Sequence, residues 1–358
     1  MRKIAFASLF ILLIAAGCRN QEATSDLPRG KVSAEWAAAV EDFYQEAVSV
    51  QAPDKAQPYS IMVLKKGKVV YEGYFAGFTP DSLTEVFSVS KTVLALAAGF
   101  AVEEGKISVD DRVTDYFPDR LPENVSDTLS SMTIRHLLTM TCGMEETPKL
   151  LSAFKGNTSF SWLEEFFASR QANMPGTEFY YNFFAPYILA AIIQNEVGTG
   201  IVDYIRPRLL EPLQITDMQW DTSFEGICVG GWGMRLCPED MAKLGQLLLQ
   251  RGKWKGRQLI SSQWIDTMTS NLVDSRPINA FVVDRDPVKL SDPANDHTQG
   301  YGYYVWQGRA HTYRMEGILG QFVIVSPARN LVLVITSNSN MDQRYMDIIW
   351  KHFSPFFQ

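Results

Sequence analysis

Apolar and polar positions follow different periods in different parts of the chain. Residues 34–50 carry apolar residues at helical spacing, and residues 60–75 form two apolar-rich stretches on either side of a polar turn, which is typical of a β-hairpin. From about 106 to 225 the patterns are mostly helical, with interruptions by proline and glycine. Strand patterns return between 300 and 338, and an amphipathic helix over 341–353 closes the chain.

This order of elements predicts the fold class. Strands at both ends with helices inserted between them imply an α/β (α+β) fold, in which an antiparallel sheet flanked by helices is built from about residues 34–105 and 226–358. The inserted residues, about 106–225, are expected to form a mainly helical lobe. A cleft between two lobes is the natural place for a functional site.

The N-terminal residues have the pattern of an export signal. Two basic residues precede an apolar stretch over 4–16, which is too short to span a bilayer comfortably. The sequence IAAGC, which ends at Cys18, resembles a bacterial lipoprotein box and implies removal of residues 1–17 and lipidation of Cys18. We expect a polar tether over 18–33 and a lipid-anchored protein on the periplasmic or extracellular face of the bacterial cell envelope. Simple secretion after a nearby cleavage is the alternative.

Composition and charge narrow the classes of function. The 358 residues are 46% hydrophobic, and the net charge of −7 without a long basic run argues against a nucleic-acid partner. The four histidines are dispersed without ligand spacing, so we expect no metal site, and no cofactor is predicted. Cys142, Cys228 and Cys237 are expected to be reduced thiols, with one Cys228–Cys237 bridge as the alternative.

The candidate chemistry begins at Ser88, three residues before Lys91. Both lie in the first turn of a strongly helical segment, where positions i and i+3 share a face, so their side chains can touch. The positive helix end and burial would both disfavour the ammonium form of Lys91, which could then accept the hydroxyl proton. A second pair, Ser152 and Lys155, runs into Gly156 and is expected to have no such function.

A loop ahead of an apolar helix contains candidate partners for this pair. It carries Tyr180 and Asn182, which a turn of this kind can direct into a cleft together. In this hypothesis Tyr180 exchanges the proton, and Asn182 holds Lys91 and a substrate carbonyl. A polar loop whose tyrosines only pack is the alternative.

A second candidate segment surrounds Gly317. Glycine permits close approach of the backbone to a substrate, and the N–H groups of Ile318 and Ser88 would then bind the carbonyl oxygen as it becomes negative. A hairpin turn without function is the alternative.

Together, these segments resemble those of the β-lactamase-related serine hydrolases: class C β-lactamases, DD-peptidases and the esterases that share their fold. Further landmarks in the expected order, such as MTIRHLLTMTCGM (132–144) and GGWGMR (230–235), extend the resemblance over about residues 35–355, so a single domain is expected over 34–358. The resemblance implies roles for six residues: Ser88 as the acylated nucleophile, Lys91 as its base, Tyr180 as a second acid/base, Asn182 as a polar support, and Gly317 with Ile318 as the strand side of the site.

One position departs from the family pattern. Where β-lactamases and peptidases usually carry lysine or histidine two residues before the glycine, this chain has Met315. The missing cation would have helped to bind a substrate carboxylate. Arg314 should face the other way on an extended strand, and His311 is a second candidate substitute.

We therefore expect an exported serine hydrolase that acts through a Ser88 acyl-enzyme on a small-molecule or peptide substrate with an ester or amide bond. A β-lactamase or DD-peptidase is one alternative. The other is a non-catalytic envelope binding or sensor lipoprotein with the same fold.

Overall fold

The computed structural model describes residues 27–50, 55–156, 158–276, 294–340 and 343–358. The predicted signal segment and Cys18 lie outside these residues, as does most of the predicted tether. Within the described ranges, no helix has the length and apolar character needed to cross a membrane.

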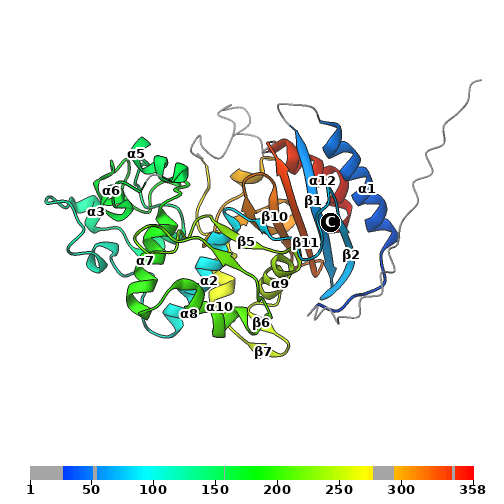
Figure 1. Ribbon diagram of the computed structural model, residues 1–358, viewed down its shortest axis with the longest axis horizontal. Helices are drawn as coiled ribbons and strands as arrows, with labels where there is room; N and C mark the ends of the chain where they lie inside the picture. The colour runs from blue at the N-terminus through cyan, green and yellow to red at the C-terminus, as the bar shows by residue number, and fades with distance from the viewer. Residues whose placement is uncertain (1–26, 51–54, 157, 277–293, 341–342) are drawn as a thin grey trace, which may run out of the picture.

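A six-stranded antiparallel sheet forms the centre of one lobe, with the strand order β2-β1-β11-β10-β9-β8 (Figure 1). The strands are β1 (Ala56–Lys65), β2 (Lys68–Tyr74), β8 (Trp306–Gln307), β9 (Tyr313–Gly317), β10 (Gln321–Ser326) and β11 (Leu331–Ser339). The first strand pairs with the last, so both ends of the chain build one sheet. The predicted hairpin and the predicted C-terminal strands are confirmed.

Alternating side chains direct the two faces of the sheet into two hydrophobic cores. One face packs against α1 (Ala34–Ser49) and α12 (Gln343–Phe357), which lie together on the outer side of the sheet (Figure 1). The other face packs against α2 (Val89–Glu103) and α9 (Pro238–Leu249). Because strand residues alternate between faces, a strand buried on both sides is apolar throughout, as β11 is.

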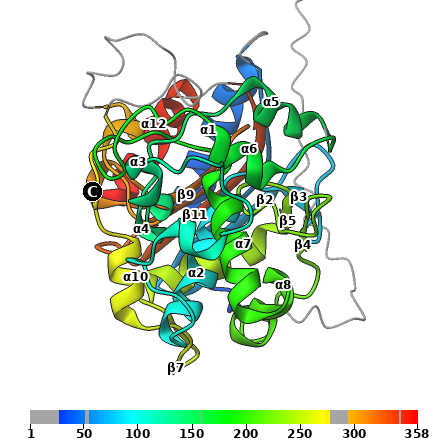
Figure 2. The same ribbon diagram turned by 90° about the vertical axis from the view of Figure 1, so that its left-hand side faces the viewer.

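The residues between these elements form the helical part of the molecule (Figure 2). Its α-helices in the described residues are α3 (Asp127–Ser130), α4 (Ile134–Leu138), α5 (Pro148–Leu151), α6 (Trp162–Ala168), α7 (Ala185–Val197) and α8 (Ile201–Ile205). A three-stranded sheet in the order β3-β5-β4 (Thr84–Glu85, Met234–Leu236 and Gln219–Trp220) joins this part to the segment ahead of α2. Two strands, β6 (Lys253–Trp254) and β7 (Arg257–Gln258), and α10 (Ser262–Met268) follow α9. The predicted fold class is confirmed.

Helix α2 lies between the sheet and the helical lobe. All residues from Val89 to Ala101 are buried, because α2 contacts β9 on one side and α7 and α8 on the other. Gly99 permits close packing of α10 on α2, since a Cβ there would lie 2.5 Å from Nε1 of Trp264. The helix therefore holds its first turn, and with it Ser88, at the junction of the two lobes.

Candidate active site

Ser88 is the N-cap residue of α2 and is only 8% exposed. The residue before it, Phe87, has a positive φ of 47°, which is uncommon for a residue with a side chain and turns the chain sharply into the helix. The end of β9 lies against this turn, since a Cβ on Gly317 would lie 2.2 Å from the carbonyl oxygen of Val86. Only glycine fits there, so the backbone of the strand approaches the backbone that precedes Ser88.

The amine of Lys91 contacts the hydroxyl of Ser88 directly. Its Nζ donates to Oγ of Ser88 at 2.8 Å and to the carbonyl oxygen of Gly231 at 2.9 Å. The side chain is buried, and burial lowers the pKa of Lys91 to about 7, against an opposing effect of Glu146. In a substantial fraction of the protein molecules the amine of Lys91 is therefore neutral at neutral pH, and a neutral amine can accept a proton from Ser88.

Gly231 is a contact that sequence reasoning did not identify. Its carbonyl oxygen is the second hydrogen-bond partner of Nζ of Lys91, and a Cβ at this position would lie 2.9 Å from the Phe183 carbonyl oxygen and 3.4 Å from Nζ. The sequence predicts no role for the GGWG segment beyond the family resemblance, because residue type does not reveal that a backbone carbonyl group will accept a hydrogen bond.

The tyrosine beside Ser88 and Lys91 is Tyr181, not Tyr180. The ring centroid of Tyr181 lies 4.9 Å from Nζ of Lys91, and its side chain hydrogen-bonds to that of Ser88. Burial raises the pKa of Tyr181, which keeps the phenol protonated at neutral pH. Tyr180 is half-buried, and its backbone N–H donates to the carbonyl oxygen of Met140. Neighbouring side chains on a non-helical chain point in different directions, so the prediction was wrong by one residue.

Asn182 has a structural position that differs from the predicted one. It is completely buried, and its Oδ1 accepts hydrogen bonds from the N–H groups of Phe184 and Ala185 at 2.8 and 2.7 Å, at the start of α7. Its Nδ2 donates to the carbonyl oxygen of Met144 at 3.1 Å. In the described part of the chain these side-chain bonds all go to backbone atoms, so the predicted support of Lys91 is wrong. Instead of the Asn182 amide, the ring of Phe183 lies near Lys91, 5.4 Å from Nζ.

Glu146 is a second residue that sequence reasoning missed. It accepts a hydrogen bond from the N–H of Phe183, and burial raises its pKa to about 7 against the opposing effects of that bond and of Lys91. The carboxyl group therefore both holds the segment that carries Tyr181 and acts electrostatically on the base. Nothing in the local sequence marked it, because it follows another glutamate and has no helical or strand spacing to Lys91.

The strand side of the site carries no free cation at the position that the family pattern gives to one. Met315 is buried on the same face as Gly317. Arg314 faces the other way, as predicted, and its Nε donates to Glu316 at 2.6 Å. His311 is exposed in a 3-10 turn. Among the described side chains, neither substitute therefore supplies the missing charge beside Gly317.

A buried cluster lies behind this strand. Glu316 accepts from Arg314 and also contacts Nε2 of His297 at 2.7 Å. Burial alone would raise the pKa of Glu316, but the charges and hydrogen bonds of Arg314 and His297 outweigh it and bring the pKa to about 2. The cluster is therefore an internal ion network that supports the position of Gly317.

Ile318, which follows Gly317, is 55% exposed. In the described residues neither its N–H nor that of Ser88 donates to a backbone carbonyl outside regular elements. The N–H of Ser88 and that of Ile318, which follows the glycine packed against Val86, are therefore the candidate donors of an oxyanion site.

The second pair, Ser152 and Lys155, lies in a helical turn that glycine ends, as its sequence predicts. Ser152 to Lys155 form a short 3-10 turn, η2, that ends at Gly156 with φ of 78°, and the hydroxyl of Ser152 donates to the carbonyl oxygen of Lys149. Cys142, Cys228 and Cys237 are free thiols. Over the described ranges, no group of side chains could hold a metal ion.

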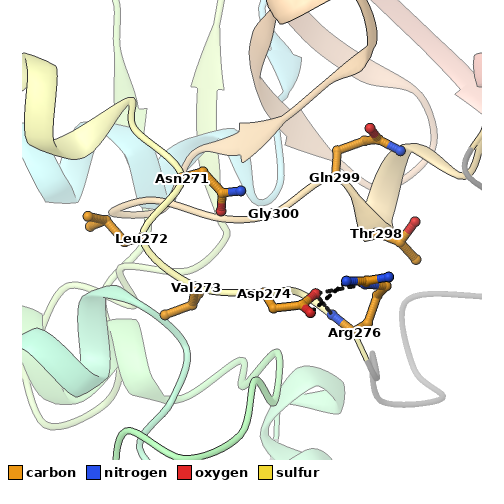
Figure 3. Close-up of a pocket in the computed structure, with 8 residues that line it drawn as sticks. All are labelled: Asn271, Leu272, Val273, Asp274, Arg276, Thr298, Gln299 and Gly300. Atoms are coloured by element: carbon orange, nitrogen blue, oxygen red, sulfur yellow. Dashed lines mark hydrogen bonds and ion pairs between the residues drawn. The ribbon is translucent and has the colours of Figure 1, made fainter.

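A cavity of about 320 Å³ lies between residues 271–276 and 298–300 (Figure 3). Its charged groups, Asp274 and Arg276, pair with each other at 2.8 Å (Figure 3). Since neither Ser88 nor Lys91 lines it, we assign it no part in the chemistry.

Comparison with known proteins gives consistent similarities. The Beta-lactamase family model matches residues 50–351. The chain is 23% identical over 241 residues to a 6-aminohexanoate-dimer hydrolase of Paenarthrobacter ureafaciens, which covers 62% of this chain and 61% of that protein. It also spans only 33% of Staphylococcus aureus protein flp, at 27% identity over 44% of this chain.

Solved structures share the fold at low identity. EstCE1, a hydrolase with promiscuous acyltransferase activity, superposes with a TM-score of 0.68 at 18% identity, over 89% of this chain and 98% of that one. A penicillin-binding protein homologue from Caulobacter crescentus gives 0.65 at 18% identity, over 90% and 99%.

Proposed function

Because the chain belongs to the Beta-lactamase family, we propose that it is a serine hydrolase that cleaves an ester or amide through an acyl-enzyme on Ser88. The observation that carries this proposal is the 2.8 Å contact between Nζ of Lys91 and Oγ of Ser88 in a buried setting that lowers the pKa of the amine. Tyr181 takes the acid/base role that the sequence suggested for Tyr180.

Acylation would begin with proton transfer from Ser88 to the neutral amine of Lys91, while Oγ attacks the substrate carbonyl carbon. The backbone N–H groups of Ser88 and Ile318 would stabilise the negative carbonyl oxygen. The phenol of Tyr181 would then give its proton to the leaving oxygen or nitrogen and recover one from Lys91. Each proton has a donor and an acceptor within the same cluster.

Deacylation would use the same groups in reverse. A water molecule replaces the leaving group and loses its proton as it attacks the acyl carbon, either directly to the neutral amine of Lys91 or through Tyr181, whose phenol passes its own proton to Lys91 as it accepts the one from water. Collapse of the tetrahedral intermediate returns the proton to Oγ of Ser88 and releases the acid. Of the two alternatives raised above, β-lactamase or DD-peptidase action is disfavoured, because Met315 stands where a carboxylate-binding cation would be.

We also propose that the protein is exported and anchored through Cys18, which the basic, apolar and small-residue pattern of residues 1–18 supports. Labelling with radioactive palmitate in a bacterial host tests this, with Cys18→Ala as the variant. Loss of label in the variant supports the anchor, and an unlabelled wild type contradicts it.

The hydrolase assignment is tested with a fluorophosphonate probe. We expect wild type and Ser152→Ala to be labelled and Ser88→Ala to remain unlabelled. Labelling that persists in Ser88→Ala would contradict the assignment. Turnover of p-nitrophenyl acetate, measured beside the intact mass of the protein, separates a hydrolase from a sensor that accumulates a stable adduct.

A further inference from the structure

Three aromatic side chains extend from Lys91 toward the surface. They are Phe183, Phe154 and Trp232, here called the aromatic wall. Building on the proposed acyl transfer at Ser88, we propose that the aromatic wall binds the acyl part of the substrate and selects uncharged acyl groups that carry an aromatic ring or a comparable apolar group.

The three rings are in continuous contact. Phe183 begins the wall 5.4 Å from Nζ of Lys91. Its ring centroid lies 5.4 Å from that of Phe154 in an edge-to-face arrangement, and Phe154 lies 4.4 Å from Trp232. These separations are typical of attractive aromatic pairs. The path therefore leads from the reacting groups outward without a polar interruption among the three side chains.

The wall is built from segments that are far apart in the sequence. Phe154 belongs to η2 in the helical lobe, whereas Trp232 directly follows Gly231, whose carbonyl oxygen holds Lys91. Because Gly231 must remain in place for that bond, Trp232 has a fixed position relative to the base. The segment from Ser152 to Lys155 therefore contributes a ring to the aromatic wall.

The outer end of the wall is accessible to a ligand. Phe154 is 42% exposed and Trp232 is partly buried, while Phe183 is 7% exposed. A half-exposed aromatic pair beside a reactive centre has apolar area that a bound apolar group would remove from water. Ile318 adds a further apolar side chain, 55% exposed, next to the oxyanion donors.

The charge of the site agrees with an uncharged acyl group. No member of the aromatic wall is ionisable, and Met315 is buried where a cation would attract a carboxylate. Lys91 is committed to Ser88 and Gly231. A carboxylate on the acyl group would therefore lose water without gaining a partner among these residues.

The arrangement distinguishes the acyl side from the leaving-group side. Tyr181 must face the leaving atom in order to protonate it, and its ring stacks on Trp306 at 5.5 Å and contacts Tyr301. Phe183 contacts Phe154, on the way to Trp232. The rings of Tyr181 and Phe183 touch, with centroids 5.7 Å apart, but their further neighbours differ, so a leaving group beside Tyr181 would place the acyl group at the aromatic wall.

The experiment compares p-nitrophenyl esters of acetate, 4-phenylbutyrate and succinate, so that only the acyl group changes. In the wild type we expect kcat/KM for phenylbutyrate to exceed that for acetate by roughly tenfold or more, and succinate to fall below acetate. Trp232→Ala should reduce the phenylbutyrate-to-acetate ratio by roughly tenfold. Phe154→Ala, at an exposed position, should act in the same direction and serves if the tryptophan variant does not fold.

Phe224→Ala is the matched control. Phe224 is an aromatic side chain, 50% exposed, and its ring contacts Trp162 rather than the aromatic wall. We expect it to leave the ratio unchanged. A ratio near one in the wild type, a ratio unaffected by both wall variants, or a preference for succinate would each overturn the inference.

A second series keeps acetate and varies the alcohol. If Trp232→Ala alters the selectivity of this series and not of the first, the wall binds the leaving group and the acyl assignment is wrong. Turnover of acetate that depends on Ser88 together with a flat acyl series refutes the inference alone. Absence of both turnover and probe labelling refutes the proposed function, and the inference with it.

Discussion

Glu146 allows a test of the electrostatics of the base. The change is Glu146→Gln, which removes a negative charge near Lys91 but retains an oxygen that can accept from the N–H of Phe183. Glu146 favours the ammonium form of Lys91 and raises its pKa, although burial dominates and brings the pKa to about 7. Removing the charge should therefore lower the pKa of Lys91 further. The fraction of neutral, reactive amine then increases at any pH below the midpoint.

The size of this effect follows from the arrangement. Opposite charges beyond ion-pair contact in a partly buried site interact by roughly 1–3 kcal/mol, and about 1.4 kcal/mol corresponds to one pH unit. The pKa of Glu146 is itself raised to about 7, so the carboxylate is only partly ionised in the relevant range. We therefore expect the acid limb of kcat/KM to move down by about one pH unit.

The assay is the pH dependence of kcat/KM for p-nitrophenyl acetate between pH 5 and 9. Glu145→Gln is the matched control, because Glu145 is the neighbouring carboxylate but pairs with Arg170 at 3.4 Å on the surface. We expect its profile to match that of the wild type. An acid limb that stays in place or moves up in Glu146→Gln would refute the electrostatic coupling. A uniform loss of rate without a shift would show that Glu146 only holds the loop.

Three further predictions test the site and its supports. Tyr181→Phe should lower kcat by roughly 10²- to 10⁴-fold, the usual contribution of a general acid or base. The kcat of Tyr180→Phe should stay within a few-fold of the wild-type value. The reverse order would assign the acid/base role to Tyr180. Asn182→Ala should destabilise the fold by about 2 kcal/mol in urea unfolding, because buried N–H and C=O groups lose their partners; an unchanged midpoint would contradict this. Glu316 has a pKa lowered to about 2 from 4.5, so its stabilisation is present above about pH 4.5 and is lost as the pH falls toward 2. Glu316→Gln should thus reduce the melting temperature more at pH 6 than at pH 3, and an equal reduction at both would refute the ion-network account.

The parts of the site that local chain geometry determines could be predicted. Ser88 and Lys91 are three residues apart at the start of a helix, and helical geometry alone brings their side chains together. The strands could be predicted in the same way, because short segments with apolar residues at alternate or successive positions are typical of β-strands. The end of the helical turn at Gly156, after Lys155, could also be predicted, because glycine tolerates a positive φ.

Contacts that depend on tertiary packing could not be predicted in the same way. Two adjacent tyrosines are chemically equivalent in the sequence, and only the packing of the loop shows that Tyr181 points to Ser88. Asn182 is buried just before α7, where its side chain accepts from the N–H groups of Phe184 and Ala185, a role that its residue type permits equally well. Glu146 and the carbonyl group of Gly231 act on Lys91 from distant parts of the sequence. Neither spacing nor composition indicates that they lie near it in space.

Pairing of β1 with β11 joins two parts of the sheet that lie at opposite ends of the chain. Ser60 and Thr336, which are 276 positions apart, share a hydrogen bond of 2.6 Å in the interior of the sheet. Until the last strands have been synthesised, Gly317 has no neighbouring strand to hold it against Val86, and the nucleophile lacks half of its surroundings. Assembly of the site must therefore wait for contacts of very long sequence separation, which form slowly, and we expect that a chain shortened before β10 and β11 does not assemble it.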